Sequence, residues 1–197
     1  NHVTLGYTAS ALQGDTTQNL TLNGLTMADA NGEIRFEDSE NAGKIEQLDI
    51  AVDSKASIDQ IDDNTGASDV LSDLTTVNVN AAAEADLGTV SAPAMTSFDA
   101  SASTAGVTAN VSEANGNDLS VTGGEGDDYI SFGDGSALNE NDSIDLGGGE
   151  NTLSVTGDTT NSNLDVANIT TLQVSTDQDT TNVAASEFGD GVEGFRG

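Results

Sequence analysis

The chain has 197 residues, and its 34 Asp and Glu against 4 Lys and Arg give a formal net charge of −30 at pH 7. This surplus argues against nucleic acid and anionic membranes as partners, since both are bound through Lys and Arg. Without Cys there is neither a disulfide nor a thiolate metal site, and with one His and no Trp we expect no enzyme. No apolar run reaches the roughly 18 residues of a membrane span, so we expect no direct membrane insertion.

Short stretches of alternating apolar and polar residues predict β-strands from the start of the chain. Such stretches lie at 20–22 and 48–52. Between them, Asn31-Gly32 supplies the turn residues of a tight hairpin over 28–36. The turn-forming stretch DNTG at 63–66 marks a boundary, so we expect an irregular β region with a hairpin over 1–66 and a regular one over 67–197.

The region 67–197 carries short apolar segments at nearly regular intervals, and each interval fits one strand and one turn. The segments begin near residues 77, 87, 98, 107, 119, 130, 144 and 153. Two further stretches, 68–74 and 183–189, predict single helical turns. The spacing suits a β-sandwich or a solenoid. A sandwich usually anchors its core on large aromatic residues, which are scarce here, so the pattern favours an all-β parallel β-solenoid or β-roll with irregular rungs and short helical turns.

One nonapeptide stands out in this region. Residues 123–131, GGEGDDYIS, match the pattern G-G-x-G-x-D-x-U-x at every defined position. The glycines let the backbone turn tightly and direct carbonyl oxygens to one point, Asp128 adds a carboxylate, and Ile130 anchors the following strand in the core. Such a turn offers the oxygen ligands that a hard cation prefers.

Degenerate copies of the nonapeptide follow in frame. Residues 137–145 place Asp142 at the sixth position, and residues 146–154 place Asn151 there. The alternative interpretation is a surface loop rich in Gly and Asp that binds nothing.

On these motifs the segment 116–157 resembles the calcium-binding RTX repeat family. The resemblance implies a parallel β-roll with Ca²⁺ bound in the turns between stacked units. Because the stretch 132–136 interrupts the repeat and 137–145 lacks glycines, we expect one or two ions. The candidate metal ligands, carried over from the family pattern or belonging to the same acidic block, are Gly124, Gly126, Asp127, Asp128, Asp134, Asp142, Gly147, Gly149 and Asn151.

The wider sequence looks like the solenoid segments of large secreted bacterial proteins, most of all the surface-layer proteins of Gram-negative bacteria with RTX repeats. This resemblance implies a calcium-dependent structural subunit on the extracellular cell surface, whose partners are copies of itself in a lattice or filament. A cell-surface polysaccharide is a further expected partner, through regions outside this chain. Two alternatives stay open: a solenoid spacer in a large secreted adhesin, and the calcium-binding tail of a secreted hydrolase.

Overall fold

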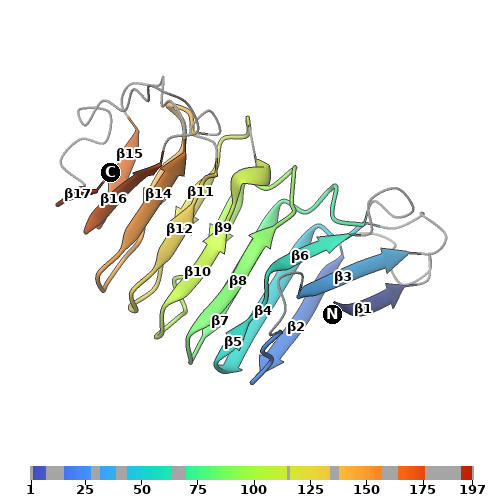
Figure 1. The fold of residues 1–197 in the computed structure, drawn as a ribbon. Coiled ribbons are helices and arrows are strands. Elements are labelled where there is room, and N and C mark those ends of the chain that lie inside the picture. The colour runs from blue at the N-terminus through green and yellow to red at the C-terminus, as the bar shows by residue number, and fades with distance from the viewer. Residues whose placement is uncertain are drawn as a thin grey trace.

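The computed structural model describes residues 2–7, 16–27, 32–38, 44–63, 70–114, 116–133, 138–156, 164–175 and 192–196. Within them the chain passes back and forth between two parallel β-sheets (Figure 1). The first sheet contains, in spatial order, β1 (His2–Tyr7), β3 (Glu33–Asp38), β6 (Gln60–Asp63), β8 (Ala85–Val90), β10 (Val107–Asn110), β12 (Tyr129–Ser131), β14 (Thr152–Thr156), β16 (Thr171–Ser175) and β17 (Phe195–Arg196), with β5 (Ala56–Ser57) also paired to β8. The second contains β15 (Asp165–Ala167), β13 (Ser143–Asp145), β11 (Ser120–Thr122), β9 (Ser97–Asp99), β7 (Thr76–Ala81), β4 (Gln47–Ser54) and β2 (Thr17–Asn23).

This architecture confirms the predicted parallel β-solenoid and excludes the β-sandwich, whose sheets are antiparallel. One coil consists of a strand in each sheet with a corner after each strand. In the second sheet Phe98 lies opposite Val121 and Val121 opposite Ile144, so one full coil separates each of these residues from the next. The predicted unit of one strand and one turn is therefore half a coil.

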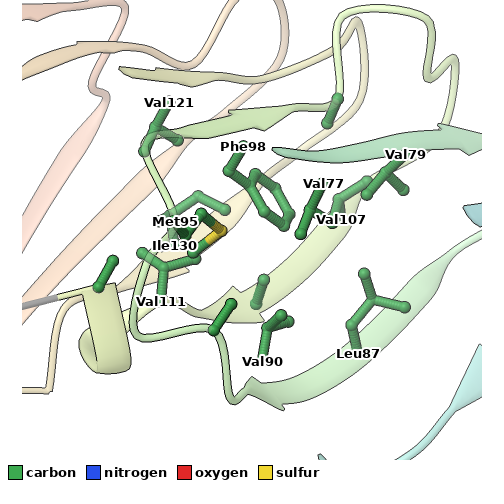
Figure 2. Packing of buried hydrophobic residues seen from close by; sticks show 14 of the residues in the cluster. Val77, Val79, Leu87, Val90, Met95, Phe98, Val107, Val111, Val121 and Ile130 are labelled. Atoms are coloured by element: carbon green, nitrogen blue, oxygen red, sulfur yellow. The ribbon is translucent and has the colours of Figure 1, made fainter. Parts of the chain in front are cut away.

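The core lies between the two sheets and follows from the alternation in the strands. In β7, for example, Val77 and Val79 are buried while the residues between and beside them are half-buried or exposed. Phe98 is fully buried and sits between its register partners Val77 and Val121, as Figure 2 shows. Each coil thus stacks aliphatic and Phe side chains on those of the next coil, so the core needs no large aromatic anchor.

One predicted local feature is wrong, and a second is described only in part. β3 has a parallel neighbour on each edge, β1 and β6, so residues 33–36 cannot pair with 28–30 and the predicted hairpin is wrong. The Asn-Gly signal is local, and it carries no information about strand partners distant in the sequence. The described part of 68–74 is a hydrogen-bonded turn in which the Leu74 N–H donates to the Leu71 carbonyl (3.0 Å).

The described helical structure is limited to one short 3₁₀ turn, η2 (Ser112–Ala114). No helix in the described part of the chain is long and apolar enough to cross a membrane. The stretch 183–189 and most of 63–66 lie outside the described residues, and the strands on both sides of 63–66 belong to the same two sheets.

Candidate functional site

The nonapeptide forms a corner of the solenoid between β11 and β12, which we call the first corner (residues 123–128). One coil further on, residues 146–151 form the second corner, between β13 and β14. The two corners stack directly on each other. The Gly148 N–H donates to the Gly124 carbonyl (2.8 Å), and the Thr152 N–H donates to the Asp128 carbonyl (2.8 Å).

Close stacking of these corners explains their glycines. A Cβ built on Gly126 would lie 2.3 Å from the Gly106 nitrogen of the preceding coil. A Cβ on Gly147 would lie 2.3 Å from the Gly124 carbonyl oxygen, and Gly147 also has a φ of +69°. Gly149 meets the same restriction against the Gly126 carbonyl oxygen, at 2.4 Å. The glycines that the motif assigns to carbonyl ligands are thus required by backbone packing whether or not an ion binds.

The carboxylate of Asp128 points inward and is 2% exposed. Its Oδ1 accepts a hydrogen bond from the Val107 N–H of the preceding coil (2.8 Å), and its Oδ2 accepts one from the Gly124 N–H (2.8 Å). Burial raises the pKa of the Asp128 carboxyl above its ordinary value, and these two donors offset part of the rise. Asp127, by contrast, is exposed, and its Oδ1 accepts from the Glu150 N–H (2.8 Å).

Asn151 occupies the position of Asp128 one coil further on and is fully buried. Its Oδ1 accepts from the Asp128 N–H (2.9 Å), while its Nδ2 lies 2.9–3.4 Å from four carbonyl oxygens, those of Leu146, Gly147, Gly148 and Asn168. An amide group has only two hydrogens to donate. The nitrogen therefore sits in a ring of oxygens that presents more acceptors than it can satisfy.

A side-chain hydrogen bond repeats from coil to coil at this edge of the solenoid. The Val107 N–H donates to Asp128 Oδ1 (2.8 Å), the Asp128 N–H to Asn151 Oδ1 (2.9 Å), and the Asn151 N–H to Thr170 Oγ1 (3.1 Å). We call Asp128, Asn151 and Thr170 the corner ladder. Each member links its own coil to the preceding one, so the sixth position of the nonapeptide has a structural role in addition to its predicted one.

Asp142 lies at the other end of β13 from the second corner, so the structure does not bring it together with the corner ladder. It is 1% exposed. Its Oδ1 accepts from the Leu119 N–H (2.8 Å) and its Oδ2 from the Asn139 N–H (2.7 Å). Burial raises the pKa of the Asp142 carboxyl, and the two backbone donors again offset part of the rise. Asp134 lies outside the described residues.

The corners can be compared with the needs of Ca²⁺, which takes six to eight oxygen ligands. Both corners have the same number of residues between paired strands. The four carbonyls around the Asn151 amide therefore have equivalents around the Asp128 carboxylate, namely the carbonyls of residues 123–125 and of Leu146. Asp128 as a carboxylate has no proton to donate to such oxygens, and a bound cation would supply the missing positive charge. The fit is to one carboxylate and several carbonyls. Among the described residues there is no group of three or more acidic or His side chains that would hold a metal.

Sequence reasoning missed several polar residues that hold the coils together. Ser103 is buried, its Oγ accepting from the Ala81 N–H (2.9 Å) and donating to the Val79 carbonyl (3.1 Å). On the opposite edge, Asn139 Nδ2 donates to the Asn117 carbonyl one coil back (2.9 Å). A search for identical polar residues one coil apart would have found Asn117 and Asn139, which are 22 residues apart, but not Ser103.

Comparison with known proteins adds no assignment: no family model, no curated protein and no solved structure matches the chain. The corners must therefore be interpreted from their own geometry.

Proposed function

We propose that this chain is a non-catalytic structural segment of an extracellular assembly, a calcium-stabilised solenoid that associates with further copies of itself. The observation that carries the proposal is the continuous parallel stack from β2 to β16, in which each coil pairs with the next in both sheets. Such a stack is an extended, stiff scaffold whose stability comes from neighbouring coils.

The buried polar groups support a structural rather than a catalytic role. An active site keeps acidic or nucleophilic groups available to a substrate. In this chain Asp128, Asp142 and Asn151 are buried, and each of them accepts hydrogen bonds from backbone N–H groups that join one coil to another.

Calcium enters the proposal through charge and through the first corner. With 34 acidic and 4 basic residues, the chain repels itself when it is compact, and divalent cations relieve this repulsion. Asp128 and the carbonyls of the first corner are the groups that would hold one ion. When bound, the ion would neutralise the buried carboxylate and fix the corner against its neighbours.

Self-association is supported by the ends of the described stack. β1 and β17 are the edge strands of the first sheet, and β2 and β15 are those of the second, among the described strands. In β1, Val3 is 42% exposed, whereas the aliphatic residues of the central coils are buried. Edge strands with exposed apolar residues pair readily with other chains.

A calcium titration followed by light scattering and electron microscopy tests this proposal. We expect calcium, but not matched magnesium or sodium chloride, to convert the protein into filaments or sheets, because calcium can coordinate carboxylates of two copies at once. Particles that bind calcium yet stay monomeric would overturn the assembly and leave a spacer function instead.

A further inference from the structure

A groove of about 530 Å³ lies on the outer face of the second sheet, away from the corners. It crosses β2, β4 and β7 and ends at the turn after β9. Its size lies within the range of small-ligand sites, about 300–1,000 Å³. None of the residues of the corner ladder lines it.

The hollow follows from the outward-facing residues of these strands. Ala51 in β4 is flanked in register by Thr21 in β2 and Asn80 in β7, so the smallest side chain lies in the middle of its row. The exposed residues Ser101 and Ala102 belong to the turn that closes one end. The floor is therefore small and apolar, while its borders carry polar groups.

A polar row runs along the groove and across the strands. Asn19, Asp49, Asn78 and Asp99 are register partners on four successive strands, so amide and carboxylate groups alternate. Gln47 Nε2 (2.9 Å) and Asn78 Nδ2 (2.7 Å) both donate to Asp49 Oδ1. These bonds hold the side chains of Asp49 and Asn78 in place. They leave Asp49 Oδ2 and the side-chain oxygen Oδ1 of Asn78 to accept hydrogen bonds from a ligand.

The chemistry of the row excludes several occupants. Asp49 and Asp99 are separated by a whole strand, about 9–10 Å, so they cannot share a cation whose oxygen ligands lie about 2.5 Å away. A nucleic acid or an acidic polymer would meet no basic residue among those that line the groove. A peptide strand could not add by backbone pairing over the floor of the groove, because β4 and β7 already have neighbours on both edges; among the described strands that the groove crosses, only β2, at the border, has an open edge.

Charge also argues against a specific site for basic peptides. Only 2 of the 12 lining residues are acidic, about the same fraction as the 34 acids in 197 residues of the whole chain. The groove therefore attracts cations no more than the rest of the surface does. What distinguishes it is the hollow at Ala51, which lies beside the hydrogen-bonded pair Asp49 and Asn78.

We propose that this groove binds an extended stretch of a neutral glycan. Carboxylate and amide oxygens accept hydrogen bonds from sugar hydroxyls, amide N–H groups donate to them, and Ala51 leaves room for the apolar face of a sugar ring. Successive strands are about 4.8 Å apart, close to the length of one pyranose residue in an extended chain. Each rung of the groove then meets one sugar residue. In an assembly with many copies, a weak site of this kind gains strength through multivalency.

The test is a titration of the ¹⁵N-labelled full chain with cellohexaose, chitohexaose and β-1,4-mannohexaose at millimolar concentrations. Hexagalacturonate and hexalysine serve as charged comparisons. We expect at least one neutral hexasaccharide to shift amide resonances of β4 and β7. Asp49→Ala and Ala51→Leu should each weaken that binding at least fivefold, one by removing an acceptor and the other by filling the floor.

Matched controls lie on the same sheet outside the groove. Asp165→Ala and Ala167→Leu in β15 should bind as tightly as the wild type, and circular dichroism checks that each variant is folded. If Asp49→Ala does not fold, the affinity of Ala51→Leu for the hexasaccharide tests the proposal alone. The proposal is overturned if no neutral hexasaccharide binds, if the groove variants bind like the controls, or if only hexalysine shifts β4 and β7. Because the groove is separate from the corners, its failure would leave the calcium and assembly proposal standing.

Discussion

Substitution of Asn151 probes the corner ladder most directly. Asn151→Ala removes the acceptor of the Asp128 N–H and the two hydrogens that the amide shares among the surrounding carbonyls. Three hydrogen bonds at about 1 kcal/mol each, and more where a buried group is left without a partner, give a loss of about 3–5 kcal/mol in the free energy of unfolding. Asn80→Ala, an exposed asparagine of β7, should change it by less than about 0.5 kcal/mol.

Urea unfolding measures the loss, and hydrogen exchange localises it. In Asn151→Ala the Asp128 amide should lose protection, while the amides of β7 should keep theirs. A loss below about 1 kcal/mol, or full protection of the Asp128 amide, would refute the structural role of the ladder.

Asn151→Asp sharpens the same experiment. It keeps the acceptor but replaces the donating amide with a carboxylate that faces carbonyl oxygens. In chelator we expect a loss of similar size to that of Asn151→Ala, because a buried charge is left without a counter-charge. Millimolar calcium should restore Asn151→Asp but not Asn151→Ala. Equal behaviour of the two variants in calcium would show that the second corner cannot hold an ion.

Three further predictions concern the core, the stacking and pH. Phe98→Ala, at a fully buried position, should cost about 3–5 kcal/mol in urea unfolding; a cost below about 1 kcal/mol would contradict the core packing. Gly126→Ala should cost about 1–3 kcal/mol because its Cβ would meet the Gly106 nitrogen, whereas Gly6→Ala, with nothing within 4 Å, should be nearly neutral; equal costs would contradict close coil stacking. Burial raises the pKa of Asp142 in the folded state, so protonation favours folding: the melting temperature should rise as pH falls from 7 toward the unfolded pKa of about 4. Asp142→Asn should flatten that rise, and an unchanged slope would show that Asp142 does not contribute to it.

The fold could be predicted because it depends on local patterns. Alternation in 77–79 and 107–111 marks strands with one buried face, and the scarcity of large aromatic residues separates a solenoid from a sandwich. The coil period could not be obtained in this way. In the regular region each strand pairs with the next strand but one along the chain, not with its neighbour in sequence, so the interval between successive apolar segments gave half a coil.

The sequence identified the residues of the candidate corners but not how their side chains are arranged. The motif identified Asp128 and Asn151 as equivalent positions, and the structure places them in register on successive coils. It could not show that both side chains point into the core and bind backbone groups of the preceding coil. Nor could it show that Asp142 lies on the opposite edge of the solenoid from the corner ladder. The nonapeptide pattern does not indicate whether a position comes before or after a strand.

The most direct test of the proposed calcium-stabilised solenoid is thermal unfolding, followed by circular dichroism, in chelator, magnesium and calcium. Calcium at a thousand times its Kd should stabilise the folded chain by about 4 kcal/mol, which for this size of chain corresponds to roughly 8–16 °C in Tm. Asp128→Ala should lose most of this calcium-dependent shift, and Asp165→Ala, at an exposed position outside the corners, should keep it. The same Tm for the wild type in chelator and in millimolar calcium would contradict the account.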